Sequence, residues 1–168
     1  LVHYYTGVHI RDAGNNNALL NPSYRWNPLQ INWGTPDNRP PMMYHGSTYP
    51  ISVEVQNTGL SDWTCGYPNF SYELRYRWAK AGHGEDAGSG SASVCGTSMG
   101  DPSPTVNLTI QNIPNWGSGA YSIRFDIYVT SASGSFWFRD YGWPTYNVSV
   151  CVDGPCKVYI PLVLKNYP

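Results

Sequence analysis

The sequence contains one stretch, Phe70-Ser-Tyr-Glu-Leu-Arg-Tyr-Arg-Trp78, in which apolar and polar side chains alternate without a break. Successive side chains of a β-strand point to opposite faces, so this spacing puts the aromatic and aliphatic residues on one face and the charged residues on the other. We therefore expect a β-strand here that is buried on one face and solvated on the other.

The same alternation recurs on both sides of this stretch. It runs through residues 51–55, 106–110, 121–129 and 146–152, and turn-forming sequence such as Asn57-Thr-Gly59 and residues 131–134 lies between the segments. Short alternating strands separated by turns predict an all-β fold, an immunoglobulin-like antiparallel β-sandwich.

The composition agrees with strands and turns and excludes two classes of partner. Charged residues make up 12% of the chain and aromatic residues 15%. Many Ser, Asn and Gly residues favour turns over helix interiors, whereas aromatic residues suit pleated sheets. The formal net charge of -1 gives no electrostatic footprint for nucleic acid, and no basic cluster indicates an anionic membrane surface. We expect neither nucleic-acid binding nor membrane insertion.

Two regions lack the alternating pattern. Residues 1–48 begin with a candidate strand over residues 1–10, and prolines at positions 22, 28, 36, 40 and 41 then disfavour a long regular element before Tyr49. Residues 79–104 are rich in Gly and Ser, and we expect an extended loop that Cys95 anchors. The chain is therefore divided into an N-terminal extension, residues 1–48, and a sandwich, residues 49–168, that ends in a strand at residues 158–164.

Four cysteines permit three disulfide connectivities. The turn sequence in Cys151-Val-Asp-Gly-Pro-Cys156 can bring those two sulfurs together, which leaves Cys65 to pair with Cys95. A zinc site would need Cys-x-x-Cys pairs or neighbouring His, and the sequence has neither. Disulfides indicate an oxidising, extracellular compartment. We interpret the chain as a secreted mature product whose signal peptide has already been removed.

The C-terminal segment Val158-Tyr-Ile-Pro-Leu-Val-Leu164 is apolar on both faces, so both faces need cover. Pro161 cannot donate a ladder hydrogen bond and therefore indicates an edge strand. The favoured interpretation is an edge strand of the chain's own sandwich. The alternative is an assembly strand, Val158, Ile160, Leu162 and Leu164, that pairs with a neighbouring subunit.

Three further groups of residues carry a resemblance. They are Val53-Glu-Val-Gln-Asn-Thr-Gly-Leu-Ser-Asp-Trp63, then Tyr72-Glu-Leu-Arg-Tyr-Arg-Trp78, and Gly119-Ala-Tyr-Ser-Ile-Arg-Phe-Asp126 with Trp137-Phe and Gly142-Trp-Pro-Thr145. Together they resemble the four-tryptophan immunoglobulin-like domain of secreted bacterial proteins and of the central region of selective-autophagy receptors. The tail Tyr159-Ile-Pro-Leu-Val-Leu-Lys-Asn also resembles the C-terminal ends of many secreted bacterial proteins.

The resemblance covers about residues 50–152 and implies a β-sandwich with Trp63, Trp78 and Trp137 in signature positions. Trp116 or Trp143 would be the fourth. These tryptophans are expected in the core, because each indole buries a large apolar area. The family is not an enzyme family, so no catalytic residue is carried over. The N-terminal segment, residues 79–104 and the cysteines depart from its pattern, which excludes an autophagy role.

A search for chemistry finds no catalytic, cofactor or metal site. The four histidines, His3, His9, His45 and His83, lack metal-ligand spacing, and no nucleophile elbow or phosphate loop occurs. Glu85 and Asp86 would face opposite ways on a strand. Asp12 with residues 15–17 could supply oxygens to Ca²⁺, but a plain turn is the favoured interpretation. Three N-glycosylation sequons begin at Asn69, Asn107 and Asn147.

We therefore expect a secreted, non-catalytic structural or adhesive protein that associates with other protein subunits. Its sharpest form is a subunit of an extracellular filament or surface layer assembled by β-strand addition. The alternative is a carbohydrate-binding module with polysaccharide as its partner, which would use exposed aromatic residues such as Trp26, Trp33 and Trp116. A hydrolase with an unrecognised site ranks far behind both.

Overall fold

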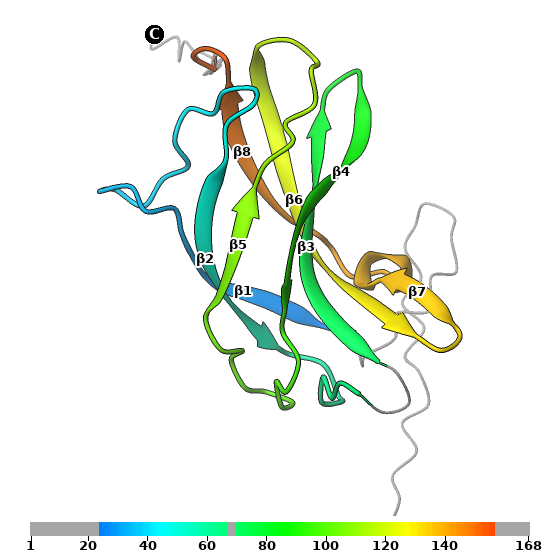
Figure 1. The fold of residues 1–168 in the computed structure, drawn as a ribbon. Coiled ribbons are helices and arrows are strands. Elements are labelled where there is room, and N and C mark those ends of the chain that lie inside the picture. Colours follow the sequence, from blue (N-terminus) through cyan, green and yellow to red (C-terminus); the bar gives the residue numbers. More distant parts are fainter. Residues whose placement is uncertain (1–23, 67–69, 157–168) are drawn as a thin grey trace, which may run out of the picture.

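The computed structural model describes residues 24–66 and 70–156, which form two antiparallel sheets (Figure 1). The elements, in chain order, are β1 (Trp26–Asn32), β2 (Tyr49–Asn57), β3 (Ser71–Lys80), β4 (Gly84–Ser93), β5 (Val106–Ile110), β6 (Gly119–Ser131), β7 (Gly134–Trp137), the short 3₁₀ helix η1 (Phe138–Tyr141) and β8 (Tyr146–Val152). One sheet has the strand order β1-β2-β5. The other has the order β4-β3-β6-β7, with β8 also paired to β6.

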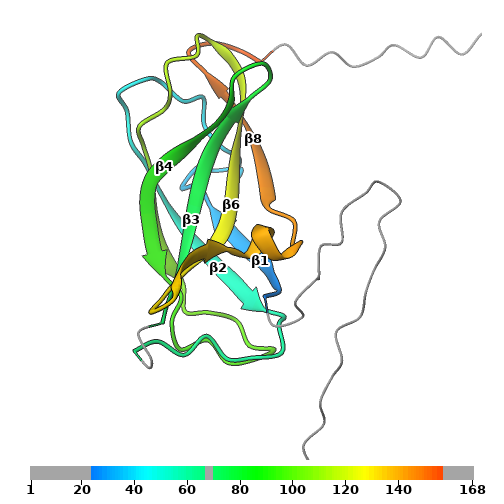
Figure 2. The ribbon, with the colours of Figure 1, turned by 90° about the vertical axis from the view of Figure 1, so that its right-hand side faces the viewer.

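The pair β3 and β6 forms the centre of the five-stranded sheet. Nine consecutive residue pairs join the two strands, from Ser71 opposite Thr130 to Ala79 opposite Ser122. The first half of β6 continues the sheet through β8, and its second half continues it through β7. Figure 2 shows β4, β3, β6 and β8 side by side. The outer face of this sheet carries the arginine side chains of β3 and β6.

The core lies between the two sheets and is made by the alternating residues that the sequence predicts. Every second residue of β3 from Tyr72 to Trp78 is buried, and β6 buries Tyr121, Ile123, Phe125, Ile127 and Val129. Trp63 is 1% exposed and packs against Tyr72 and Phe138. The all-β antiparallel sandwich and its five alternating strands are confirmed.

A strand lies before Tyr49, although the prolines of this region disfavour one. β1 pairs with β2, so the three-stranded sheet begins at Trp26 rather than after residue 48. Pro28 is accommodated because β1 is an edge strand and its register shifts between Pro28 and Gln30. Proline is tolerated in sheets at such edge positions and bulges, since its missing N–H has no partner to lose.

The Gly- and Ser-rich segment is not one extended loop as predicted, because residues 84–93 form β4. A Cβ atom on Gly88 would lie 2.1 Å from the buried ring of Tyr76, and one on Gly90 would lie 2.4 Å from the carbonyl oxygen of Thr109. The glycines are therefore present because β4 passes close to the core and to β5, and not because the segment lacks structure.

Several predictions concern residues that the structure does not describe. They are the strand over residues 1–10, the calcium alternative at Asp12, the sequon at Asn69 and the assembly strand Val158, Ile160, Leu162 and Leu164. All of these lie outside the described residues.

Candidate functional site

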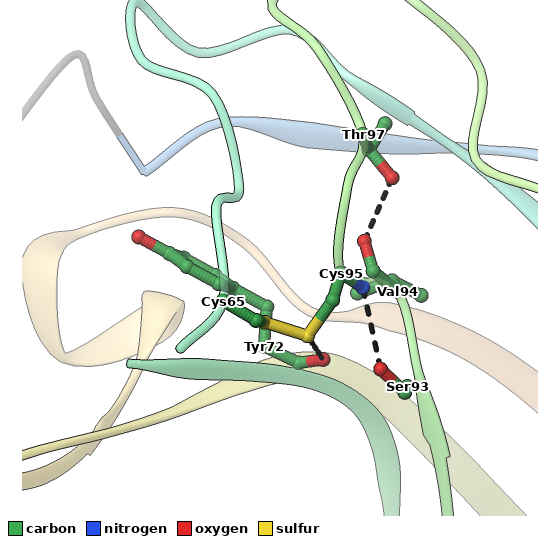
Figure 3. The surroundings of a disulfide bond; sticks show 6 residues. All are labelled: Cys65, Tyr72, Ser93, Val94, Cys95 and Thr97. Atoms are coloured by element: carbon green, nitrogen blue, oxygen red, sulfur yellow. Dashed lines mark hydrogen bonds between the residues drawn. A yellow bond between two sulfur atoms is a disulfide. The ribbon is translucent and has the colours of Figure 1, made fainter. Parts of the chain in front are cut away.

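Both cysteine pairings predicted from the sequence are present. Cys65 and Cys95 are bonded with their Cα atoms 5.5 Å apart, and Cys151 and Cys156 with theirs 5.2 Å apart. Figure 3 shows the first bridge beside Tyr72, whose carbonyl oxygen lies 3.7 Å from Sγ of Cys95. The same carbonyl accepts a hydrogen bond from the N–H of Val94 at 3.0 Å. Two disulfides fit an extracellular protein.

The signature tryptophans do not share one environment. Trp63 and Trp78 lie in the core, as expected. Trp137 lies outside it, because its register partner on β6 is Tyr128, whose side chain points to the outer face. Trp143 is partly buried, and the guanidinium of Arg25 lies 4.4 Å from its ring centroid.

The tryptophans expected to be exposed for sugar stacking are covered instead. Trp26 and Trp33 are buried in the core. Trp116 is partly buried, and its ring stacks between His83 and Tyr121. These residues therefore offer no open stacking platform, and any saccharide site must lie elsewhere.

A cluster of charges occupies the outer face of the five-stranded sheet. The carboxylate of Glu85 on β4 accepts hydrogen bonds from Arg77 on β3 at 3.4 Å, from Arg139 in η1 at 2.7 Å, and from Arg124 on β6. We call these four residues the Glu85 cluster. Burial alone would raise the pKa of Glu85, but the hydrogen bonds from Arg139 and Arg124 hold it below its ordinary value.

Aromatic rings continue the cluster across the same face. The guanidinium of Arg77 lies 4.2 Å from the ring centroid of Trp137, and that of Arg75 lies 4.0 Å from the ring of Tyr128. The rings of Trp137 and Tyr128 contact each other edge to face, and their centroids are 4.9 Å apart. Cation–π contacts of this kind hold guanidinium groups at fixed positions on a partly solvated surface.

A groove with a volume of about 450 Å³ lies next to the cluster, where β3, β4 and β6 begin or end. Ala79, Ala120 and Ser122 line it together with the charged residues Lys80, Glu85 and Arg124. The ammonium of Lys80 donates to three backbone carbonyls of residues 116–118 at 2.6–3.0 Å, which fixes its position. We call this feature the outer groove.

One carboxyl group on the outer face is buried. Asp126 is 1% exposed, and its oxygens accept hydrogen bonds from the backbone N–H groups of Ile127 at 2.8 Å and Arg139 at 3.2 Å. Burial raises the pKa of Asp126 to about 7, although these two hydrogen bonds act in the opposite direction.

The two described histidines take structural positions. His45 hydrogen-bonds to Asp153 through Nδ1, and its Nε2 lies 2.9 Å from the carbonyl oxygen of Pro114. The hydrogen bond with Pro114, followed by that with Asp153, raises the pKa of His45, and the same pair lowers the pKa of Asp153. Within residues 24–66 and 70–156, no group of three His, Cys, Asp or Glu side chains could hold a metal ion.

Two of the three sequons lie in the described chain. Asn107 on β5 and Asn147 on β8 are both exposed, as the alternation predicts. Asn147 is the register partner of Arg124, so this sequon lies on the face that carries the Glu85 cluster.

Neither the Glu85 cluster nor the outer groove is predicted by the sequence pattern, in which Glu85 and Asp86 are adjacent and would face opposite sides of a strand. The alternation does predict a charged outer face, because it places three arginines on that side: Arg75, Arg77 and Arg124. The position of Glu85 beside Ala79 required β4, which the sequence pattern did not reveal.

Comparisons with known proteins add little to this description. No protein-family model matches the chain, and no curated protein matches it. Among solved structures, the chain is similar to the ASH/PapD-like domain of human CEP192 (PapD-like domain 7) at 11% identity, with a TM-score of 0.32 over 93% of this chain and 100% of that chain. So distant a likeness carries no argument about function.

In the described part of the chain, no helix is long and apolar enough to cross a membrane.

Proposed function

We propose that this chain is an extracellular, non-catalytic structural or adhesive protein that assembles with copies of itself by β-strand addition. The observation that supports the proposal is the edge of β8. This strand pairs in unbroken register with β6 on one side. On its other side, Met43 pairs with the C-terminal end of β8, because its N–H donates to Cys151 and its carbonyl accepts from Asp153. Among the described residues, no backbone hydrogen bond leaves that side between Tyr146 and Ser149.

The composition of this edge favours strand addition. Natural edge strands are protected by Lys, Pro, bulges or covering segments. Residues 146–152 contain no Lys, Arg or Pro and no register shift. Tyr146 is 41% exposed and Val148 is partly exposed, so apolar side chains at the edge have surface left to bury.

The C-terminal segment supplies a donor of matching chemistry. Residues 158–164 follow β8 after a short disulfide-closed turn, and they are apolar on both faces. Main-chain hydrogen bonds give such an added strand its affinity, and pockets for alternate side chains give it specificity. The resemblance to the four-tryptophan domain, a binding module rather than an enzyme, agrees with this role.

Light scattering after size exclusion, followed by electron microscopy, tests the proposal over a range of protein concentrations. The full chain is expected to form oligomers or filaments, and a chain ending at residue 156 is expected to be monomeric. Tyr146→Lys should also abolish assembly, because it places a charge where the donor strand packs. Tyr44→Lys, at an exposed tyrosine outside any strand, is the matched control and should assemble normally.

A strictly monomeric full chain over the whole concentration range would overturn the proposal. Assembly that survives both the truncation and Tyr146→Lys would overturn the assignment of β8 as the acceptor.

A further inference from the structure

The outer groove lies beside an excess of positive charge. The Glu85 cluster contains three guanidinium groups and one carboxylate, and Lys80 also lines the groove. Asp126 accepts from the backbone of Arg139 and Asp140 from the backbone of Trp137, and neither residue lines the groove, whose lining has Glu85 as its one acidic residue. A ligand that enters this groove therefore meets a cationic rim.

Arg124 is the guanidinium best placed to reach such a ligand. Its side chain is 40% exposed, against 22% for Arg77 and 28% for Arg139, and it alone of the three lines the groove. Its Nε atom is buried and its Nη1 donates to Glu85, so a ligand in the groove would meet the exposed part of the guanidinium at its Nη end. A planar guanidinium offers charge-assisted donors that suit the recognition of a carboxylate.

The floor of the groove is different in character. Ala79 and Ala120 present methyl groups, and Ser122 presents one small hydroxyl between them. Larger side chains at these register positions would fill the groove. An inorganic anion would gain nothing from this apolar floor, whereas a ligand with one apolar face and an acidic edge would contact both the floor and the rim.

We propose that the outer groove binds an anionic saccharide. A pyranose ring has C–H groups on its faces, which fit the alanine floor, and a uronate carboxylate or a sulfate ester at its edge, which fits the guanidinium of Arg124. The three N–H groups of Lys80 are taken by backbone carbonyls, so Lys80 contributes through its charge alone. The volume of about 450 Å³ falls in the range of small-molecule sites, which is roughly 300–1,000 Å³. The groove residues Ser122 and Arg124 are register partners of Ser149 and Asn147, so the site lies one strand inward from the free edge of β8. Binding at the groove does not depend on assembly.

Contacts with neighbouring residues fix the charged side chains of the groove in place before a ligand binds. Arg77 is held over Trp137, and Arg139 is held by η1, so Glu85 is fixed and in turn positions Arg124. Lys80 is fixed by its three carbonyl acceptors. A site that needs no reordering loses less affinity to immobilised side chains.

Titration calorimetry of the full chain tests the proposal with four probes. They are oligogalacturonate, which carries carboxylates, dextran sulfate, which carries sulfate esters, neutral cello-oligosaccharide, and poly-glutamate, a polyanion without sugar. Binding of either anionic saccharide is expected, with the better one identifying the acidic group. Added salt should weaken binding, because the rim contributes through charge.

Two variants locate the site. Arg124→Gln is expected to weaken binding about tenfold, and Ser122→Tyr should do the same by filling the groove without changing charge. Arg39→Gln, which removes an exposed charge from the loop between β1 and β2, is the matched control and should bind normally. Thermal melting confirms that each variant is folded.

Three outcomes would overturn the proposal. They are no binding of either anionic saccharide, equal binding of poly-glutamate, and binding that Ser122→Tyr leaves unchanged while that variant is folded. Binding of the neutral saccharide alone would also contradict it, since the cationic rim would then have no role.

Discussion

The backbone N–H of Arg139 donates a hydrogen bond of 3.2 Å to the carboxyl group of Asp126, which is buried beneath η1 on the outer face of the sheet. The side chain of Arg139 turns the other way and binds Glu85 at 2.7 Å. One residue of η1 therefore joins a buried carboxyl group to the charged surface. The stability of this contact is expected to depend on pH.

Stability should fall as the pH rises from about 4 through 7. The pKa of Asp126 is about 7 in the folded chain, against 3.8 ordinarily, so the folded state binds the proton more tightly than the unfolded state does. The difference corresponds to roughly 4 kcal/mol lost above pH 7, at 1.36 kcal/mol per pKa unit. Urea denaturation of the wild type and of Asp126→Asn between pH 4.5 and 8 measures it.

Asp126→Asn should flatten this part of the pH profile, while the exposed substitution Asp37→Asn should leave it unchanged. Equal slopes in the wild type and in Asp126→Asn would show that Asp126 does not carry the effect.

The hydrogen-bonded pair of His45 and Asp153 should stabilise the fold over a limited pH range. The raised pKa of His45 contributes stability that is complete below about pH 6.5 and is lost as the pH rises through the folded-state pKa. The lowered pKa of Asp153 contributes stability above about pH 4 that is lost as the pH falls through its folded-state pKa. NMR titration of His45 should show a raised pKa that moves toward the ordinary value in Asp153→Asn. An unchanged titration in that variant would contradict the pairing.

Gly90→Ala should destabilise the fold by about 1–3 kcal/mol, the usual cost of overpacking. The added methyl group would lie 2.4 Å from the backbone oxygen of Thr109, which cannot move without disturbing β5. Chemical denaturation measures the change in the free energy of unfolding. Ser91→Ala, at an exposed position on the same strand, is the control and should change stability by less than about 0.5 kcal/mol.

The two disulfides should differ in what their removal costs. The chain-entropy model assigns about 3.6 kcal/mol to a bridge that spans 30 residues and about 2 kcal/mol to one that spans five. Replacing Cys65 and Cys95 by Ala should therefore lower stability more than replacing Cys151 and Cys156. Thermal melting of both double variants decides the order, and the reverse order would show that local packing outweighs chain entropy.

Alternation along single strands was enough to predict the core. Tyr72, Leu74, Tyr76 and Trp78 are buried because a period of two in an isolated strand already separates its faces. β4 could not be found this way, since Gly88 and Gly90 are dictated by the neighbours Tyr76 and Thr109. The alternation within one strand does not show which other strands will lie beside it, so contacts between strands cannot be predicted from it.

The same limit explains the candidate site. Arg77 and Arg124 are 47 positions apart in the sequence but are register partners, and Glu85 joins them only because β4 pairs with β3. Two tryptophans were predicted to be exposed and are buried. Trp26 and Trp33 are surrounded by prolines in the sequence, which predicts loops, yet both lie in the core.

The bridge between Cys65 and Cys95 has a mechanical consequence. If the two ends of the chain are pulled apart, tension along the covalent chain passes from residue 65 to residue 95 through the sulfur atoms. Load can then reach β3 only through its hydrogen bonds with β6. At about 3.3–3.6 Å per extended residue, the 30-residue segment withholds roughly 100 Å of length from any stretching of the chain. A molecule under load would thus extend by less than its sequence allows, even after its sheets had separated.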